Sequence, residues 1–413
     1  MRKPHIVIVG NGFGGVYTAK YLRKFVASNK ADVTVIGNHN YFLFTPLLHE
    51  VATGGLTPTC IIEPLREIFR NDGIRVLQDD VRGVHLRDNY IESGVGRIMY
   101  DYLVLSTGAS VNYRVVKGAM EYSFGLKDIT QALALRNHII NVFERAETYE
   151  RDLTELSFIV VGGGPTGVEI AGELEEFVCQ TLASYYSWDE NERTKIKIII
   201  VASGNGILAQ GSTRLRRKAE RIMLKKGIEI IADDSVREVK EDGVLLESGR
   251  FISSFATVWA AGVEPSPPNF LHDSPACVQN GRLCVDAELK IEGFENAFAL
   301  GDVASQAGGS GGLQMPMLAQ SAVQEARVVA DNIIATIEDK PLREFRYRSK
   351  GFLVSLGRWQ AVGDIFGMTF SGPLMWWLWR TIYLFKFLSW RKRFKIMAEW
   401  TVNLFYPRDI STL

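Results

Sequence analysis

Short apolar runs rich in β-branched residues recur along the chain, and several of them end directly in glycine. The first run, HIVIVG (5–10), is followed by an amphipathic stretch to about Phe25 and by a second run, ADVTVIG (31–37). Such runs are typical of strands buried on both faces, as in a parallel sheet covered by helices. The beginning of the chain therefore predicts a strand, a glycine turn, a helix and a second strand.

The turn after the first strand has its glycines at the spacing of a nucleotide-binding loop. In GNGFGG, Gly10 allows a tight turn, Gly12 lets the backbone approach a diphosphate, and Gly15 lets the helix pack on the strand. The diphosphate would lie at the helix N-terminus, where free N–H groups and the helix dipole favour an anion. We therefore expect this segment to bind a dinucleotide.

The same order of elements returns in the middle of the chain. Its segments are FIVV (158–161), GGGPTG (162–167), a helical stretch from Val168 to Cys179 and the strand KIKIIIV (195–201). The polar stretch SWDENERTK before the last strand predicts a surface loop. Two such units in one chain predict two dinucleotides, or an FAD and a nicotinamide nucleotide.

Three further strands end in small residues. They are YDYLVLSTGA (100–109), TVWAAGV (257–263) and NAFALGDVA (296–304). At the tip of the last strand, Asp302 can accept hydrogen bonds from the ribityl hydroxyls of a flavin. It can also act as the N-cap of a following helix, and the two roles are compatible.

The C-terminal segment from Pro373 is rich in aromatic and basic residues. Its aromatic residues at helical offsets form one predicted stripe: Trp376, Trp379, Tyr383, Phe387 and Trp390. Arg380 lies on this stripe, and the basic residues Arg391, Lys392, Arg393 and Lys395 follow it. There is no apolar run of about twenty residues that would span a bilayer. The pattern favours a helix in the headgroup layer with its cations facing anionic lipid, although a core helix or a dimer interface remains an alternative.

Composition narrows the class of protein. Forty-seven basic residues balance forty-seven acidic ones, which argues against a protein that binds nucleic acid. The opening MRKPHIVIVG passes straight into a strand without a secretion signal, so the folded part is expected in the cytosol. Cys60, Cys179, Cys277 and Cys284 form no C-x-x-C pair, and we expect reduced, mostly buried thiols. The six histidines have no ligand spacing, so no metal site is predicted.

Four stretches together resemble one family, the type II NAD(P)H:quinone oxidoreductases. These are non-proton-pumping NADH dehydrogenases within the two-dinucleotide-binding flavoproteins. The stretches are NYFLFTPLLHEVATGGL (40–56), GGGPTGVEIAGEL (162–174), MLAQSAVQEA (317–326) and KGFLVSLGRWQAVGD (350–364). The resemblance covers nearly the whole chain, and its A-Q-x-A-x-Q-E segment is the most specific part.

This resemblance implies an α/β fold with two Rossmann-like dinucleotide-binding domains, glutathione-reductase-like, plus a C-terminal amphipathic helical membrane anchor. An FAD-binding domain would comprise residues 1–115 and 265–340, an NAD(P)H-binding domain 116–264, and a C-terminal domain 341–413. The implied reaction transfers a hydride from NAD(P)H to non-covalent FAD and then two electrons to a membrane quinone, without ion pumping. The implied protein is a homodimer on the anionic surface of the cell inner membrane, at its cytoplasmic face.

The resemblance also assigns residues to the two cofactors. The implied FAD contacts are Gly10, Gly12, Phe13, Gly14, Gly15, Asn38, Thr45, the backbone of Val81 at the adenine, Thr107, Gly108, Gly301 and Asp302. The implied contacts of the nicotinamide nucleotide are Gly162, Gly164, Thr166, Gly167 and Gly262.

Four residues have implied roles in catalysis or quinone binding. Glu169 would lie near the nicotinamide ribose, although a carboxylate at this position can instead simply complement the dipole of its helix. Gln320 and Gln324 are four residues apart and share one helix face. By the resemblance they would donate hydrogen bonds to the quinone carbonyls beside the flavin. Arg380 falls about where the family has a basic residue near the quinone.

The sequence departs from the family pattern where an acidic residue normally binds a ribose. The first unit's second strand ends in Gly37-Asn38-His39, and Asn38 can still hydrogen-bond to a ribose. The second unit's strand ends in Ala202-Ser203-Gly204, and without a carboxylate there nothing repels a 2′-phosphate. Arg214, Arg216 and Arg217 follow it. NADH and NADPH therefore both remain possible donors.

Other functions stay open on the sequence. Sulfide:quinone reductases share the fold, but they use a cysteine pair that the four cysteines here do not match, and they have no need of a second cradle. Other flavin-dependent NAD(P)H oxidoreductases, such as ferredoxin reductases, would lack the aromatic tail. A membrane-bound flavoprotein that senses NAD(P)H with negligible turnover is a further alternative.

Overall fold

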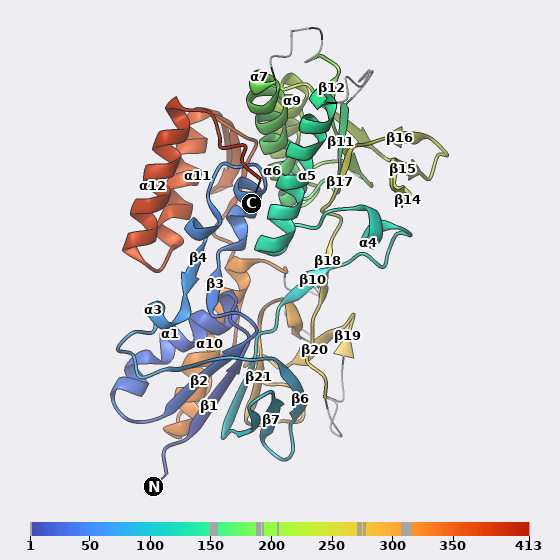
Figure 1. Cartoon of the computed structure of the whole chain (residues 1–413). Coiled ribbons are helices and arrows are strands. Elements are labelled where there is room, and N and C mark those ends of the chain that lie inside the picture. Colours follow the sequence, from blue (N-terminus) through green and yellow to red (C-terminus); the bar gives the residue numbers. More distant parts are fainter. Residues whose placement is uncertain are drawn as a thin grey trace. The chain divides into compact units, whose positions relative to one another are not determined.

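The computed structural model describes residues 2–148, 156–186, 191, 194–204, 206–270, 275, 278–306 and 316–412. The chain forms two compact units, which are coloured along the sequence in Figure 1. The first unit comprises Met1–Leu43, Ile62–Ser110 and Val263–Arg348, and the second comprises Phe44–Ile61, Val111–Gly262 and Ser349–Leu413. The segments 44–61 and 349–413 thus group with the middle of the chain. The division into cofactor domains proposed from the sequence stays a prediction.

A five-stranded parallel sheet is the centre of the first unit. Its order is β21 (Ala297–Ala299), β9 (Tyr102–Leu105), β1 (His5–Val9), β2 (Asp32–Gly37) and β5 (Arg75–Gln78). The strands are mostly apolar and buried in their middle positions, because helices cover a parallel sheet on both faces. β1 lies in the middle and the order reverses beside it, which is the arrangement of a doubly wound nucleotide-binding fold.

Two long helices of the first unit come from opposite ends of its sequence. Helix α1 (Phe13–Ala27) follows β1 directly, and α10 (Ala319–Ile337) packs against it. The smaller elements of this unit are β3 (Tyr41–Leu43), β4 (Ile62–Pro64), α3 (Leu65–Ile68), β6 (Val81–His85), β7 (Tyr90–Ser93), β8 (Gly96–Met99), β19 (Val278–Gln279), β20 (Arg282–Val285), η4 (Gly301–Val303) and β22 (Ala304–Gln306). The short strands β10 (Ala109–Val111) and β18 (Val263–Pro265) mark the boundaries of the units along the chain.

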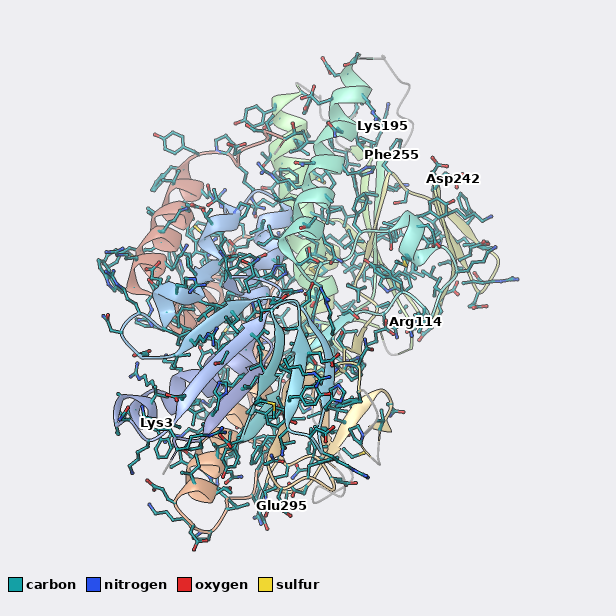
Figure 2. The ribbon with its side chains drawn as sticks, turned by 60° about the horizontal axis from the view of Figure 1, so that its bottom comes forward. Lys3, Arg114, Lys195, Asp242, Phe255 and Glu295 are labelled. Atoms are coloured by element: carbon teal, nitrogen blue, oxygen red, sulfur yellow. The ribbon has the colours of Figure 1, made fainter. Side chains whose placement is uncertain are left out.

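The second unit repeats the design with a four-stranded parallel sheet. Its order is β13 (Ile228–Ala232), β12 (Ile196–Ala202), β11 (Leu156–Val161) and β17 (Ala256–Trp259). Lys195 and Phe255, labelled in Figure 2, directly precede β12 and β17, so they mark the amino ends of these parallel strands. The glycine turn after β11 lies at the opposite, carboxyl end of the sheet, where ligands bind in such folds.

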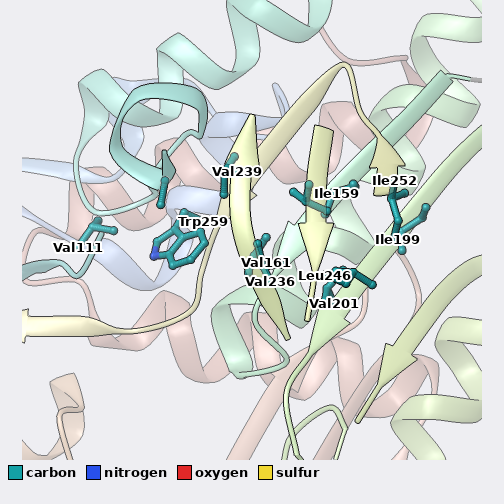
Figure 3. Packing of buried hydrophobic residues seen from close by; sticks show 12 residues of the cluster. Val111, Ile159, Val161, Ile199, Val201, Val236, Val239, Leu246, Ile252 and Trp259 are labelled. Carbon is teal, nitrogen blue, oxygen red and sulfur yellow. The ribbon is translucent and has the colours of Figure 1, made fainter. Parts of the chain in front are cut away.

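One face of this sheet is covered by a small antiparallel sheet. The covering strands are β14 (Val236–Lys240), β15 (Gly243–Leu246) and β16 (Phe251–Ser253). Figure 3 shows Ile159, Val161, Ile199 and Val201 of the parallel sheet packed against apolar residues of this layer. Trp259 lies at the edge of the cluster, and its indole N–H donates to the carbonyl oxygen of Asn112 at 2.9 Å.

Helices cover the remaining surfaces of the second unit. They are η1 (Thr45–Leu47), α2 (Leu48–Ala52), η2 (Pro58–Cys60), α4 (Ala119–Tyr122), α5 (Ile129–Thr148), α6 (Pro165–Leu174), α7 (Ala183–Tyr185) and α9 (Thr213–Lys225). Between α6 and α7 the chain forms a π-helical stretch, η3 (Glu175–Leu182). The helix predicted to end near Cys179 therefore continues beyond it. The predicted loop SWDENERTK lies largely outside the described residues.

The C-terminal segment docks onto helix α6. It forms an antiparallel sheet of β23 (Phe352–Ser355), β24 (Ala361–Ile365) and β25 (Met368–Ser371), then α11 (Pro373–Lys386) and α12 (Trp390–Phe405). A Cβ on Gly172 of α6 would lie 2.5 Å from the carbonyl carbon of Leu356. Only glycine allows the turn after β23 to approach the helix this closely.

The single aromatic stripe predicted for the C-terminus is wrong. The helix breaks at Phe387, and Trp390 begins a second helix, so the offsets do not continue across the break. Trp376, Trp379 and Phe387 are fully buried. The core alternative therefore holds for these three residues, and other positions of α11 and α12 carry the exposed apolar side chains.

The cysteines differ in part from the expectation of four reduced thiols. Cys60 and Cys179 are free, and burial raises the pKa of both thiols to about 12, so both stay protonated. Cys284 is disulfide-bonded, and for this residue the expectation is wrong. Cys277 lies outside the described residues.

Candidate active site

A nucleotide cradle joins β1 to α1 in the first unit. Gly10 has φ +109°, and a Cβ there would lie 2.3 Å from the carbonyl oxygen of Ser106. A Cβ on Gly15 would lie 1.9 Å from the carbonyl oxygen of Gly10, whereas a Cβ on Gly12 would meet no heavy atom within 4 Å. Gly10 and Gly15 are thus packed tightly against the protein backbone, whereas Gly12 faces open space. Helix α1 begins directly after Gly12 without a side-chain cap. This geometry fits a diphosphate bound by free N–H groups.

The second cradle, between β11 and α6, has the same geometry. Gly162 has φ +118°, and a Cβ on Gly167 would lie 1.9 Å from the carbonyl oxygen of Gly162. A Cβ on Gly164 would again meet no heavy atom within 4 Å. Helix α6 begins here without a side-chain cap, and Pro165 occupies its first position, where no N–H is needed. Two separate turns of the chain can therefore hold a diphosphate.

Two residues of the first unit that are predicted to bind a cofactor or substrate have a buried polar atom without a protein partner. The atoms are the hydroxyl oxygen of Thr107, after the end of β9, and the side-chain amide nitrogen of Gln320, in the first turn of α10. Buried polar atoms normally have a hydrogen-bond partner, so both atoms fit a cofactor with polar ring and ribityl groups. The residues of this unit therefore fit the FAD that the first cradle implies.

The turn that carries Asp302 is held by a buried carboxylate. The Gly301 N–H donates to Glu325 Oε2 at 2.5 Å, and the Ser321 hydroxyl donates to Glu325 Oε1 at 2.7 Å. Strand β22 follows Asp302, and the N-cap of η4 is Leu300. The alternative role of Asp302 as a helix N-cap is therefore wrong, and the ribityl role stays a prediction.

The predicted glutamine pair lies on α10, but its two members have different surroundings. Gln324 donates to the carbonyl oxygen of Arg348 at 3.0 Å and accepts from the Arg348 N–H at 3.2 Å. The oxygen and the nitrogen of the Gln324 amide are therefore both engaged by the backbone of Arg348. Gln320 keeps a buried, unpartnered amide nitrogen, so its side-chain N–H groups are available to a ligand.

Helix α6 carries Glu169 into a buried cluster of polar groups in the second unit. Glu169 accepts from the Ser355 N–H at 3.3 Å, and its other oxygen lies 3.9 Å from His49 Nδ1. Burial raises the pKa of Glu169 to about 8 and lowers the pKa of His49 to about 4. At neutral pH both groups are therefore uncharged, and the contact between them is not an ion pair.

An arginine near the C-terminus enters the same cluster. Arg408 is buried, and its guanidinium donates to Glu173 at 2.6 Å and to the Thr53 hydroxyl at 2.8 Å, and it pairs with Glu176 at 3.1 Å. Although burial alone would raise the pKa of Glu173, Arg408 holds it below its usual value. We call Glu50, Glu169, Glu173, Glu176, Arg380 and Arg408, with His49, the buried charge cluster.

Arg380 is, with Glu169, a member of this cluster that the sequence singled out. Its guanidinium carbon lies 3.8 Å from the ring centre of Trp376 and 4.7 Å from that of Trp400. Two of its nitrogens, Nε and Nη1, are buried without a partner. A guanidinium held between aromatic faces with free donors suits a ligand carbonyl.

The other predicted residues divide between the two units. Phe13, Gly14, Asn38, Val81 and Gly108 belong to the first unit, together with the first cradle. Asn38 is exposed, and Val81 begins β6. Thr166, at the start of α6, and Gly262, with φ +130°, belong to the second unit. Thr45 also belongs to the second unit, unlike the other predicted FAD contacts.

Sequence reasoning missed most of the buried charge cluster. His49 and Glu50 stand inside the stretch PLLHEVATGGL, where two polar residues in an apolar helix were the available signal. Glu173 is four residues after Glu169 and shares its helix face. No local pattern marks Arg408, because its partners are distant in the sequence.

No carboxylate directly follows strand β12, as the sequence indicated. Ala202 ends this strand and is buried, and Ser203 is exposed. The structure thus retains the feature that left NADH and NADPH open.

The fold and the two cradles define a two-dinucleotide oxidoreductase. Residues 4–326 match the family described as pyridine nucleotide-disulphide oxidoreductase, and residues 349–409 match the NDH2 C-terminal domain. A type II NADH:quinone oxidoreductase of Mycobacterium tuberculosis is 31% identical, over 98% of this chain and 89% of that protein. One of Staphylococcus aureus is 28% identical, over 95% of each. The chain belongs to the type II NADH:quinone oxidoreductase family, FAD-dependent enzymes, and the expected family and fold class are confirmed.

Solved structures agree on the fold. The chain has a TM-score of 0.90 to NDH2 from Plasmodium falciparum in complex with NADH, at 23% identity, covering 99% of this chain and 100% of that one. The sulfide:quinone oxidoreductase of Aquifex aeolicus has a TM-score of 0.72 at 19% identity, covering 98% and 96%. At these identities the likeness concerns the fold alone.

Proposed function

We propose that this chain oxidises NADH with FAD as its cofactor and reduces a membrane quinone. The observation that carries the proposal is the pair of cradles, each closed by two glycines and open at a third. One cradle serves the flavin and the other serves the nucleotide donor. When bound, FAD supplies the chemistry, by accepting a hydride and passing two electrons on.

The residues of the chain bind and orient the reactants in this proposal. The first cradle, Thr107 and Asp302 hold FAD, and the second cradle holds the NADH diphosphate at the N-terminus of α6. Gln320 donates to a quinone carbonyl, and Arg380 presents its free donors to the same ligand class. Gln324 holds the backbone of Arg348 in place through its two amide hydrogen bonds. Glu169, which is neutral and buried, lies near the nicotinamide ribose in this proposal.

We further propose that α11 and α12 attach the protein to the membrane surface. Their exposed apolar residues include Leu374, Trp377, Phe385, Trp390, Phe394 and Phe405. Of the basic residues, Lys392, Arg393 and Lys395 make hydrogen bonds within the unit, and Arg391 lies beside Trp390. No helix in the described part of the chain is long and apolar enough to cross a membrane. A headgroup-level location at the cytoplasmic face of the inner membrane follows the family resemblance.

A homodimer rests on the resemblance alone, and light scattering of the detergent-solubilised protein tests it.

Steady-state quinone reduction tests the function. We expect the purified, flavin-containing protein to oxidise NADH only when a short-chain quinone is added. NADPH belongs in the same assay, because the missing acid after β12 removes the usual barrier to its 2′-phosphate. Nucleotide binding that changes the flavin spectrum without quinone-dependent turnover would instead favour a sensor.

A further inference from the structure

Glu50 is a buried carboxyl group that the proposed function does not yet use. It lies on α2 with almost no exposed surface, and Glu50 Oε2 accepts a hydrogen bond from Trp400 Nε1 at 2.6 Å. Trp400 comes from α12, so the bond joins two segments 350 residues apart in the sequence. A carboxyl group in such a place needs either a counter-charge or a proton.

Several elements packed around Glu50 contribute titratable or charged groups. These are His49 on α2 itself, Glu169 and Glu173 on α6, Glu176 on η3, Arg136 on α5, Arg380 and Tyr383 on α11, and Arg408 and Asp409 in the C-terminal tail. Arg136 is committed to Asp409, to which it donates at 3.2 Å, and His49 is uncharged. The remaining charged groups are the carboxyls of Glu50, Glu169, Glu173 and Glu176 and the guanidinium groups of Arg358, Arg380 and Arg408.

Two of the four carboxyls, those of Glu173 and Glu176, form ion pairs with arginines, and the other two do not within the part of the chain that the structure describes. Arg408 is bound directly to Glu173 and Glu176, and Arg358 adds a second cation 3.9 Å from Glu176. In the described residues, neither Glu50 nor Glu169 forms an ion pair with a lysine or arginine. Arg380 is the remaining guanidinium group, so one positive charge is left to balance the two carboxyls of Glu50 and Glu169. Because an unbalanced buried charge is costly, the pair Glu50 and Glu169 holds at least one proton.

The two carboxyls hold their protons with different strength. Burial raises the pKa of Glu169 to about 8. Burial also raises the pKa of Glu50, to about 7, against the opposing effects of Arg380 and the Trp400 hydrogen bond. At neutral pH Glu169 therefore keeps its proton, whereas Glu50 can release one at little cost.

We propose that Glu50 is the internal proton store for quinone reduction. The inference rests on the proposed function, whose net reaction is NADH + Q + H⁺ → NAD⁺ + QH₂. The hydride brings two electrons and one proton, so one more proton is required. The Glu50 O–H bond breaks, an O–H bond of the quinol forms, and the carboxylate left behind is stabilised by Arg380 and the Trp400 N–H. Solvent then returns a proton to Glu50.

Two substitutions test the store in different ways. Glu50→Gln keeps the shape and removes the proton, so quinone turnover should fall about tenfold or more and lose its pH dependence near neutrality. Trp400→Phe keeps an aromatic face for Arg380 but removes the N–H that stabilises the carboxylate. It should move the alkaline limb of the quinone-dependent kcat to higher pH, because losing a hydrogen bond to the charged form raises a pKa.

Glu175→Gln is the matched control. Glu175 is also a buried carboxylate, on η3, but it pairs with Lys226 at 3.1 Å outside the cluster. Its substitution should leave the pH profile of quinone turnover unchanged. The rate at which NADH bleaches the flavin should be the same in all variants, since that step needs no proton from Glu50.

The outcomes separate the possibilities. Wild-type protein without quinone turnover would refute the proposed function itself. Active wild type, with a Trp400→Phe variant whose limb does not move or a Glu50→Gln variant with the wild-type profile, would overturn the proton store. A merely structural role predicts lower thermal stability and no shift of the pH limb in either variant.

Discussion

Gly164 and Gly167 are three residues apart in the second cradle, yet they are glycines for different reasons. Gly167 touches the backbone of the same turn, so its constraint is internal to the protein. Gly164 faces open space, so its constraint arises only when a ligand is bound. Substitutions at these two positions can therefore separate an effect on stability from an effect on nucleotide binding.

We expect Gly164→Ala to leave the melting temperature unchanged and to raise KM for NADH about tenfold, because the added methyl group meets only the diphosphate. Gly167→Ala should lower the melting temperature, since its Cβ would lie 1.9 Å from a backbone oxygen. Thermal unfolding and steady-state kinetics of the two variants check this. Equal loss of stability in both would show that Gly164 does not face the ligand.

The two glutamines of α10 give a second test at the residue scale. Gln320→Ala should slow quinone turnover about tenfold and leave flavin reduction by NADH fast, because only a quinone carbonyl loses its donor. Gln324→Ala should mainly lower thermal stability, because its amide holds Arg348. Stopped-flow absorbance resolves the two half-reactions. If Gln320→Ala slows flavin reduction instead, the residue does not serve the quinone.

At the scale of elements, α11 and α12 have two apolar faces with different tasks. Trp376, Trp379 and Trp400 are buried in the second unit, whereas other large side chains are exposed. Deleting residues 373–413 would therefore open the core as well as remove the proposed membrane contact. Substitutions on the exposed face are the sharper experiment.

We expect the double substitution Trp390→Ser and Phe394→Ser to release the protein from anionic liposomes without changing its melting temperature. These side chains are 64% and 59% exposed, so they contribute little to the fold and are available for the proposed lipid contact. Met120→Ser, at a position on α4 that is 74% exposed, is the matched control and should sediment as the wild type does. Unchanged sedimentation of the double variant would place the lipid contact elsewhere.

The C-terminal tail is the other element whose role follows from its contacts. Arg408→Ala should cost about 3–5 kcal/mol of unfolding free energy, because it leaves Glu173 as an unpaired buried charge. The folded-state pKa of Glu173 is lowered, so its stabilisation is present at neutral pH and is lost as the pH falls through that pKa. Denaturant unfolding at neutral and acidic pH should show the difference between variant and wild type shrinking in acid. A constant difference would mean that the pair is not the cause.

At the scale of the whole molecule, ligand binding and stability are coupled. Excess FAD at about a hundred times its Kd should stabilise the flavin-free protein by about 2.7 kcal/mol and raise its melting temperature. Differential scanning fluorimetry with FAD, and with adenosine diphosphate as the control ligand, measures this. A melting temperature that does not respond to FAD would contradict the assignment of the first cradle.

The sequence alone located both cradles, the strands beside them and the family. It succeeded there because the constraint is local. Gly15 and Gly167 each lie against the backbone of a glycine five residues earlier, and the strand before each cradle ends in an apolar run. The glutamine pair was assigned from the family's A-Q-x-A-x-Q-E pattern. The difference between its two members could not be predicted, because the partner of Gln324, Arg348, is 24 residues further along the chain.

What only the tertiary structure decided is where charge is buried and which aromatic side chains are covered. Glu50, Glu173 and Arg408 look like ordinary polar residues in the sequence, and their burial in one cluster depends on packing that joins α2, α6 and the tail. The aromatic residues of α11 and α12 follow the same rule, because composition makes them apolar but only the fold selects which of them face the interior. Steric constraints between residues close in the sequence can be predicted from the sequence. The loss of water around a side chain depends on residues that are distant in the sequence and meet only in the folded structure.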